Sequence, residues 1–293
     1  MDKLLKEPFI VSVFGPRKSG KSFAMRMWLH KKFAKHFDEI HVLCNSLNYN
    51  RDYDEFRKAG YKYKKKFLWY PDPKIDDLEK IFEEQSSEKA SFINFQRGDE
   101  LVYMMKKMAK KRKRLDYPDE VENPTMTFQR EPFGFYPIDI GVEPESKRLI
   151  DRPKKMKKVL VVLDDVVDSG VLRYHTEIDK YAMRGRHVEV SLISASQRIA
   201  PTSINVRDNS DMMILFSPST VQEMESLIDK FIPTNNKKVV RFRVAQTFNV
   251  KYDFVLVDNI ETKPYEKIGK SNCVDFLNNK IDIIDVIDIN KLC

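Results

Sequence analysis

The chain has 293 residues, of which 42% are hydrophobic and 33% charged, and its formal net charge is +8. The hydrophobic fraction is sufficient for a core in one large domain or two small ones. The chain has no run of about 18 apolar residues, which argues against a membrane-spanning helix. The basic charge suits a polyanionic partner but does not identify one.

The N-terminus and the cysteines both bear on the compartment. The first residues lack the apolar core of a signal peptide, so we do not expect a secreted protein. Cys44, Cys273 and Cys293 are odd in number and far apart, which argues against a disulfide framework and favours a reducing compartment. Neither cysteines nor histidines have the spacing of metal ligands, so no zinc site is expected.

Hydrophobic periodicity predicts strands that alternate with helices along the chain. In the first third, the predicted strands are 9–14, 39–44 and 66–70, and the predicted helices are 21–36 and 76–85. After residue 158, the predicted strands are 159–163, 187–194, 211–216, 239–244 and 252–257, and the predicted helices are 169–183 and 219–231, the latter with Thr220 as a possible cap. This order predicts an α/β fold with a mostly parallel central sheet flanked by helices.

The segment between these two parts, about 86–158, has a different composition. It contains many prolines, scattered charge and weak periodicity, apart from one helix-like piece at 101–114. Long loops inside compact domains are usually functional or disordered. We therefore expect a single domain over 1–260 with a basic, proline-rich insertion at about 86–158, and a C-terminal tail over 261–293.

The motif G-x-x-x-x-G-K-[ST] occurs at Gly15–Ser22, between a predicted strand and a predicted helix. Glycine lets the backbone wrap around an anion, and the N-terminus of the helix adds its dipole. In this context Lys21 can reach the β- and γ-phosphates of ATP, and the Ser22 hydroxyl can ligate Mg²⁺. The alternative is an ordinary glycine turn. The predicted nucleotide-binding residues are Gly15, Pro16, Arg17, Lys18, Ser19, Gly20, Lys21, Ser22 and Phe23.

A second Gly-Lys-Ser, at residues 269–271, does not fit the motif. Pro264 stands where the first glycine should be, and no apolar strand precedes it. We expect no phosphate loop there.

Two aspartates follow the aliphatic run 159–163. A buried strand would deliver Asp164 at its carboxyl end, where ligands bind in open α/β sheets. Asp164 is the candidate to hold Mg²⁺, and Asp165 could act as general base toward a water molecule. The alternative is a strand that simply ends in an acidic turn.

The next predicted strand, 187–194, leads into Ala195-Ser196-Gln197-Arg198, and the Gln197 amide could bind the γ-phosphate and the attacking water. Phosphoryl transfer also requires a cation at the γ-phosphate. Arg184 and Arg186 precede that strand and could reach a neighbouring subunit's nucleotide, with Arg198 and Arg207 as alternatives. Each of these side chains could instead be an ordinary surface residue.

Lysine and arginine cluster in three segments, namely 62–66, 106–114 and 147–158. Such clusters can bind phosphates, which makes affinity fall steeply with salt, but each could also be a solvated face. No helix-turn-helix or zinc-finger pattern occurs, so sequence-specific reading of DNA is not expected.

Taken together, residues 12–22, Leu163-Asp164-Asp165, Arg186-His187 and Ser194-Ala195-Ser196-Gln197 resemble the poxvirus-type genome-packaging ATPases of large DNA viruses. That family belongs to the FtsK–HerA branch of P-loop motors. The resemblance covers about residues 8–45 and 155–235. One departure is that many members of the superfamily have Glu where Asp165 stands.

The resemblance implies a RecA/FtsK-like ATPase that forms a homo-oligomeric ring and drives double-stranded DNA into a preformed capsid. It implies Walker A roles for Lys21 and Ser22, a metal role for Asp164, a base role for Asp165 and a sensor role for Gln197. The arginine finger would be Arg184 or Arg186. Capsid or portal proteins would be partners, and the protein would work in the virion or at the assembly site in the host cytoplasm.

Two other classes of function remain open from the residues alone. A nucleoside or nucleotide kinase would use the same loop, and the basic insertion could imitate its lid, but Gln197 suits water activation better. A regulatory nucleotide switch would bind without much turnover. The guanine-reading Asn-Lys-x-Asp pattern is absent, because residues 235–238 read Asn-Asn-Lys-Lys.

Overall fold

The chain forms two compact units in the computed structural model, one of Met1–Ser87 with Lys157–Cys293 and the other of Glu88–Met156. The structure describes residues 7–31, 33–45, 66–113, 126–131, 134–139, 155–166, 176–198, 202–232, 237–260, 268–271 and 282–283.

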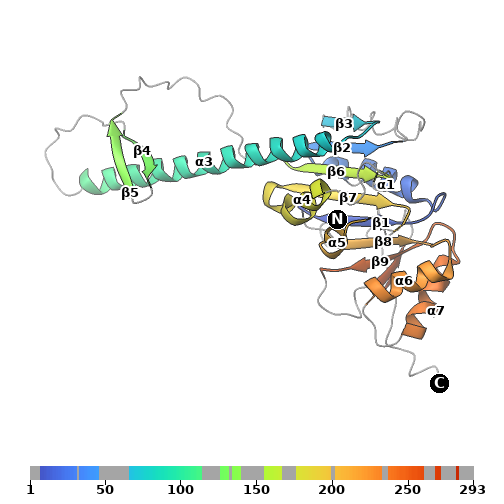
Figure 1. Cartoon of the computed structure of the whole chain (residues 1–293). Coiled ribbons are helices and arrows are strands. Elements are labelled where there is room, and N and C mark those ends of the chain that lie inside the picture. Colours follow the sequence, from blue (N-terminus) through green and yellow to red (C-terminus); the bar gives the residue numbers. More distant parts are fainter. Residues whose placement is uncertain are drawn as a thin grey trace. The chain divides into compact units, whose positions relative to one another are not determined.

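Within the described residues of the larger unit, nine strands form one sheet in the order β11-β10-β9-β8-β1-β7-β6-β2-β3 (Figure 1). The strands from β8 to β3 are parallel, and β9, β10 and β11 add antiparallel pairs beyond β8. The strands are β1 (Ile10–Phe14), β2 (Glu39–Cys44), β3 (Lys66–Tyr70), β6 (Val159–Asp164), β7 (Val190–Ser196), β8 (Met212–Phe216), β9 (Phe254–Asp258), β10 (Ile268–Ser271) and β11 (Asp282–Ile283).

The central strands are buried on both faces, which explains their continuous aliphatic sequences. Every residue of β1, β2, β6 and β8 is buried. Parallel strands have such continuous aliphatic sequences because helices cover both faces of the sheet. The predicted α/β class with a mostly parallel central sheet is therefore confirmed.

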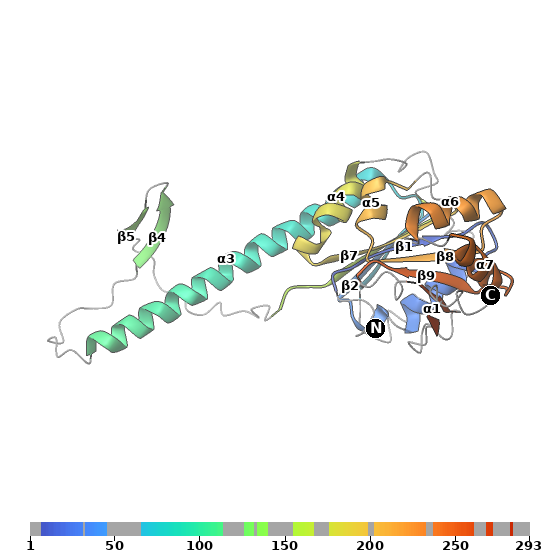
Figure 2. The same cartoon turned by 90° about the horizontal axis from the view of Figure 1, so that it is seen from below.

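Helices cover the two faces of the sheet (Figure 2). On one face, Trp28 of α1 packs in a core with Val11 and Val13 of β1. On the other face, Tyr181 of α4 packs with Leu163 of β6, while α6 and α7 cover the part of the sheet near β8 and β9. The helices are α1 (Lys21–Lys31), α3 (Ile75–Lys113), α4 (Thr176–Arg184), α5 (Ile204–Asp208), α6 (Val221–Phe231) and α7 (Lys237–Phe248), with short 3₁₀ helices at Phe33–Lys35 and Gly185–Val188.

The predicted strand at 239–244 is wrong, because this segment lies inside helix α7. Val240 and Val244 are both buried and belong to the core that α6 and β9 share. Residues four apart lie on one face of a helix. The intervening Arg241 and Arg243 imitate the alternation of a strand, so short-range patterning predicted the wrong period.

The predicted helix at 76–85 and the helix-like piece at 101–114 belong to a single 39-residue helix, α3. The segment that joins them has no proline, the residue that most strongly breaks a helix, and Gly98 is its only glycine. Its periodicity is weak because most of its described side chains are exposed. The predicted end of the first helix at residue 85 is therefore wrong.

The smaller unit contains the distal part of α3 and an antiparallel pair of strands, β4 (Met126–Glu131) and β5 (Gly134–Asp139). Its bounds, Glu88–Met156, lie near those of the predicted insertion. Apart from Lys155 and Met156, its remaining residues lie outside the described part of the chain. That this unit is an insertion in a single ATPase domain stays our proposal.

Other element boundaries differ modestly from the predictions. Strand β7 begins at Val190 rather than at residue 187, because Gly185–Val188 forms a 3₁₀ helix and Glu189 has a left-handed φ of 59°. Thr220 caps α6 as predicted, accepting a hydrogen bond from the Glu223 backbone N–H at 3.1 Å. Helix α5 was not predicted. The second Gly-Lys-Ser lies within strand β10, which confirms that it is not a phosphate loop.

A buried charged network lies where β2 and β3 begin. The carboxylate of Glu39 accepts from Lys66 at 3.1 Å and from Lys157 at 2.6 Å, and its Oε1 lies 3.0 Å from His41 Nε2. The other ring nitrogen of His41 is 3.0 Å from the Tyr70 hydroxyl. Burial alone would raise the pKa of Glu39, but the hydrogen bonds from His41, Lys157 and Lys66 outweigh it and hold the pKa well below its ordinary value. Burial raises the pKa of Tyr70 to about 12, so its hydroxyl stays protonated.

This network predicts an acid-dependent contribution to stability. A carboxyl group whose pKa is lower in the folded state stabilises above its unfolded pKa, about 4.3, and loses that contribution as the pH falls toward the folded pKa. We expect Glu39→Gln to lower the free energy of unfolding by about 2 kcal/mol at pH 7, and the difference from wild type to shrink below about pH 4. Urea unfolding at several pH values measures this, with the exposed Glu100→Gln of α3 as control. A difference that stays constant down to pH 3 would contradict the assignment.

Candidate nucleotide-binding site

The motif residues converge at one edge of the sheet. Gly15 directly follows β1, Asp165 follows β6 and Gln197 follows β7. These strands are parallel neighbours in the order β1-β7-β6, so their carboxyl ends lie together. Ligands bind at this edge in open α/β sheets. Tertiary structure thus brings together three segments that are far apart in sequence.

The loop between β1 and α1 is held in a specific shape. Gly15 N–H donates to the Ser196 carbonyl at 3.2 Å, which ties the loop to the end of β7. Lys18 and Gly20 both have positive φ, 64° and 98°. A Cβ on Gly15 would lie 2.7 Å from Phe216 Cβ, so glycine is required there. Turns of this kind point successive N–H groups toward one site, which makes a cradle for an anion.

Lys21 is the first residue of α1, and its side chain is only 4% exposed. Its Nζ donates to Asp165 Oδ1 at 2.5 Å. The second oxygen of Asp165 accepts from Gln197 Nε2 at 3.3 Å, and Gln197 Oε1 accepts from Arg17 Nε at 3.3 Å. These predicted site residues therefore form one continuous chain of contacts.

The backbone orients Asp165 toward that chain. Its φ is 56°, a left-handed conformation that few residues other than glycine adopt. Its N–H donates to the Ala195 carbonyl at 3.1 Å. The sharp turn after β6 sends Asp164 and Asp165 in different directions, and the Asp165 carboxylate remains one-third exposed, accessible to a water molecule.

Asp164 ends β6 and is 2% exposed. Its Oδ2 lies 3.8 Å from the Cys44 thiol, at the end of the neighbouring strand β2. Ser22 is partly exposed in the first turn of α1. No group of three or more candidate metal ligands exists among the described residues. Mg²⁺ at a triphosphate uses one or two protein oxygens and takes its other ligands from water and phosphate.

The donor set fits the nucleotide that the motif implies. The cradle of N–H groups, the buried Lys21 ammonium and the Asp164 carboxylate are the types of group that bind a triphosphate with Mg²⁺. In this arrangement Ser22 and Asp164 would hold the ion. Phe23, the last of the predicted nucleotide contacts, is exposed, and the Arg26 guanidinium lies 5.4 Å from its ring centroid.

The two predicted finger arginines lie at the opposite edge of the sheet. Arg184 ends α4 and Arg186 is in the following 3₁₀ helix, both before β7 begins, whereas Gln197 follows its end. A strand of this length spans about 20 Å. Neither arginine can therefore act on the nucleotide of its own chain.

Arg186 already has partners. It donates to Asp211 Oδ1 at 2.6 Å and to the Asn209 carbonyl at 3.3 Å. Burial raises the pKa of Asp211, although the Ile10 N–H and Arg186 partly oppose it. Arg184 is exposed and has no ion pair within the described part of the chain. Of the two, Arg184 is the more available to a neighbouring subunit.

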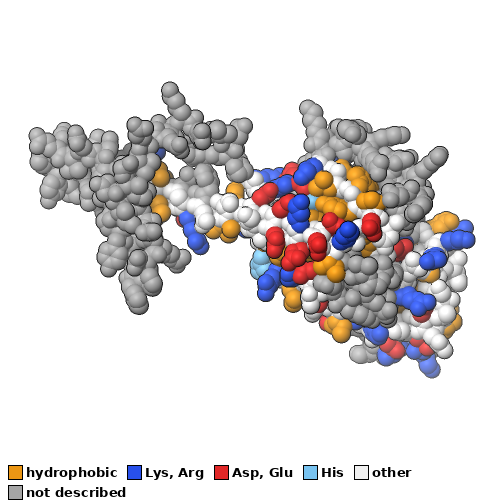
Figure 3. Space-filling view, turned by 45° about the horizontal axis from the view of Figure 1, so that its top comes forward, with side chains coloured by type: hydrophobic (Ala, Val, Ile, Leu, Met, Phe, Trp, Pro, Cys, Tyr) orange, Lys and Arg blue, Asp and Glu red, His pale blue; other side chains and the backbone are white. Residues whose placement is uncertain are grey.

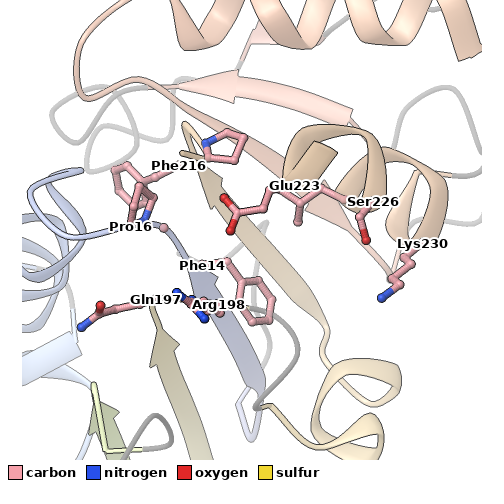
Figure 4. Close-up of a pocket in the computed structure, with 11 residues that line it drawn as sticks. Phe14, Pro16, Gln197, Arg198, Phe216, Glu223, Ser226 and Lys230 are labelled. Atoms are coloured by element: carbon pink, nitrogen blue, oxygen red, sulfur yellow. The ribbon is translucent and has the colours of Figure 1, made fainter. Parts of the chain in front are cut away.

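A small cavity of about 160 Å³ adjoins Gln197 (Figure 4). Arg198 lines it next to Gln197, and Glu223, Ser226 and Lys230 of α6 face it from the other side. Helix α6 was not among the predicted site elements. The only indication in the sequence was that α6 directly follows β8, the strand that neighbours β1 on the side opposite β7.

The basic clusters are only partly described. Residues 62–65 and 147–154 lie outside the described residues, while Lys106 and Lys107 are exposed on α3. Among the described residues, every helix is either too short or too polar to cross a bilayer, including the long α3.

The contact between Lys21 and Asp165 generates a prediction about catalysis. Asp165→Asn keeps the side-chain size but removes the basic carboxylate, and general bases contribute about 10²- to 10⁴-fold to rates. We expect kcat for ATP hydrolysis to fall by about that factor, while the Kd for ATP is unchanged or lower because Lys21 loses its competing partner. Phosphate release and calorimetric binding measure the two quantities, with the exposed Asp208→Asn of α5 as control. Hydrolysis at the wild-type rate would limit Asp165 to a structural role.

Comparison with known proteins gives matches at the level of structure. No protein-family model and no curated protein matches the chain. The genome packaging NTPase B204 from Sulfolobus turreted icosahedral virus 2, solved with ATP-gammaS, is 16% identical to it, with a TM-score of 0.50 and coverage of 92% of this chain and 98% of that chain. EssC (ATPases 2 and 3) from Geobacillus thermodenitrificans is 16% identical, with a TM-score of 0.48 and coverage of 86% and 38%.

At such identities the likeness concerns the fold. It agrees with the P-loop, with the position of Lys21 at the start of α1 and with the parallel sheet that carries both. The chain therefore has the P-loop NTPase fold seen in the viral packaging NTPase B204, and the predicted resemblance is confirmed at this level.

Proposed function

We propose that this protein is a Mg²⁺-dependent ATPase that moves double-stranded DNA, and that it packages a viral genome. The observation that carries the proposal is the chain of contacts Lys21–Asp165–Gln197 at the carboxyl edge of the parallel sheet. The ammonium of Lys21 is paired with the Asp165 carboxylate. This cation lies at the phosphate loop, next to the Asp165 carboxylate and near the Gln197 amide, which can accept a proton from water and orient it, respectively.

The same contacts suggest how hydrolysis proceeds. When ATP binds, Lys21 exchanges the Asp165 carboxylate for phosphate oxygens, and Asp165 becomes free to accept a proton from water. Gln197, held by Arg17 on one side, orients that water through its amide. The phosphoryl group thereby goes to water rather than to an acceptor molecule. Mg²⁺ held by Ser22 and Asp164 would neutralise charge on the phosphates.

The DNA and packaging roles rest on charge and on fold. The net charge of +8 favours a polyanion. B204, which shares the fold, is described as a genome packaging NTPase. By this analogy the chain would form a homo-oligomeric ring, engage capsid or portal proteins, and act in the virion or at the assembly site in the host cytoplasm.

One face of the larger unit is unsuited to DNA. Acidic side chains gather over α4 and the first turns of α3 (Figure 3). Lys180 lies among Glu79, Glu83 and Glu177, and its pKa is raised by the hydrogen bond to Glu177. This face would repel phosphates, so we place the DNA-contacting surface elsewhere on the ring.

The experiment that tests the function is ATP hydrolysis with and without double-stranded DNA at low salt. We expect DNA to stimulate wild type, and Lys21→Ala to lower the rate at least about 100-fold, because the phosphates lose their buried cation. Lys80→Ala, on the exposed acidic face, is the matched control. Raising the salt should abolish stimulation steeply.

Two results would contradict the proposal. A rate that DNA leaves unchanged at low salt would remove the motor function. Transfer of the phosphoryl group to a nucleoside would identify a kinase instead.

The single variants Arg184→Ala and Arg186→Ala test whether an arginine finger acts between subunits. If one arginine reaches a neighbour's nucleotide, mixtures of that variant with wild type should lose activity more than in proportion to the variant's share. We expect this for Arg184, and for Arg186 a loss of stability from the broken pair with Asp211. Mixing curves measured at constant total protein show the difference, and straight lines for both variants would exclude a finger at either position.

A further inference from the structure

A second and larger cavity, of about 380 Å³, opens beside the phosphate loop, and its lining includes neither Asp165 nor Gln197. It is lined by residues 16–19 of the loop, residues 217–218 after β8 and residues 248–253 between α7 and β9. Its volume falls in the range of small-molecule sites, about 300–1,000 Å³. The 248–253 turn was not assigned any role above.

The positions of the catalytic candidates indicate which end of the nucleotide this cavity would receive. Asp165 contacts Lys21 from the β6 and β7 side of β1, and Gln197 in turn contacts Asp165. The γ-phosphate end of a bound triphosphate therefore faces that side. The rest of the nucleotide must leave the loop toward the other neighbour of β1, which is β8 with β9 beyond it. The cavity lies on this side, since residues 217–218 follow β8 and residue 253 precedes β9.

The turn that closes the cavity is well ordered by its own backbone. Asn249 N–H donates to the Ala245 carbonyl at 3.1 Å, and Asp253 N–H donates to the Val250 carbonyl at 3.2 Å. The first bond fastens the turn to the end of α7, and the second closes the turn directly before β9 begins. The cavity wall is thus a built feature of the fold rather than a loose segment.

Tyr252 is the unusual residue of this turn. Its φ is 72°, a left-handed conformation that is a genuine outlier for a bulky side chain and that persists only where surrounding structure imposes it. The strained backbone places the ring against the phosphate loop, because a Cβ on Gly20 would lie 2.7 Å from Tyr252 Cδ1. The ring is nevertheless half exposed, and Lys251 Nζ lies 4.8 Å from its centroid.

We propose that this cavity binds the nucleoside part of the nucleotide, with the Tyr252 ring as the aromatic surface for the base or ribose. The inference rests on the proposed function, since it assumes that the phosphate loop binds ATP. A half-exposed ring fixed beside the loop can stack on a base, which favours binding without adding flexibility. Positive charge near the α-phosphate end comes from Lys251 and from Arg17 and Lys18 of the loop.

The test compares ATP with inorganic tripolyphosphate, which has the phosphates but no nucleoside. Calorimetric titration of the full chain with Mg²⁺ gives the Kd of each ligand. Tyr252→Gly removes the ring and adopts a positive φ freely, so the turn keeps its shape. Tyr252→Phe keeps the ring, and Tyr103→Ala, an exposed tyrosine of α3, is the matched control.

We expect Tyr252→Gly to weaken ATP binding about tenfold while tripolyphosphate changes less than twofold. Tyr252→Phe and Tyr103→Ala should match wild type for both ligands. Equal weakening of both ligands would overturn the proposal, because Tyr252 would then only support the loop through Gly20. Unchanged ATP binding would also overturn it, because the nucleoside would lie elsewhere.

These results separate the inference from the function on which it rests. Binding is measured separately from turnover. If wild type hydrolyses ATP but Tyr252→Gly binds ATP as tightly as wild type does, only the proposed nucleoside cavity is excluded. Wild type that binds neither ligand removes the proposed ATPase and the cavity together.

Discussion

The ion pair between Lys21 and Asp165 is the interaction on which the candidate site depends. A lysine that is 4% exposed requires an anionic partner, because an unpaired buried ammonium is costly. Asp165 supplies that partner, with its Oδ1 2.5 Å from Lys21 Nζ. The pair fixes both groups beside the phosphate loop, where we propose that hydrolysis takes place. Removal of either partner changes the state of the other, so the two residues work as a unit.

Parallel strand order makes this pair possible. Lys21 and Asp165 lie far apart in sequence, and β7 separates their strands in the sheet. Since all these strands end at the same edge, a loop after β1 and a turn after β6 can meet across the tip of β7. The same order places β6 and β7 on one side of the phosphate loop and β8 and β9 on the other. The residues that we propose act on water lie on the β6 and β7 side, and the cavity that we assign to the nucleoside lies on the β8 and β9 side.

Much of the fold could be predicted from local patterns, and the failures have physical causes. Aliphatic runs such as those of β1 and β6 are typical of strands buried on both faces, and the structure confirms them. The α7 segment was mispredicted because its arginines alternate with valines, whereas tertiary contacts with α6 and β9 select the helical period. Helix α3 was predicted as two pieces because an exposed helix needs no regular apolar stripe.

The sequence by itself determined the phosphate loop, since glycines at 15 and 20 followed by Lys21 and Ser22 are local requirements of anion binding. It also indicated Asp164 and Asp165, which follow the aliphatic run 159–163, and Gln197, which comes shortly after the next predicted strand. Only the tertiary structure decided that Asp165 contacts both Lys21 and Gln197 and that Arg184 and Arg186 lie at the opposite edge. It alone placed Tyr252 against Gly20. These relations depend on strand order and on one strained turn, and strand order comes from packing between distant segments, which no local pattern encodes.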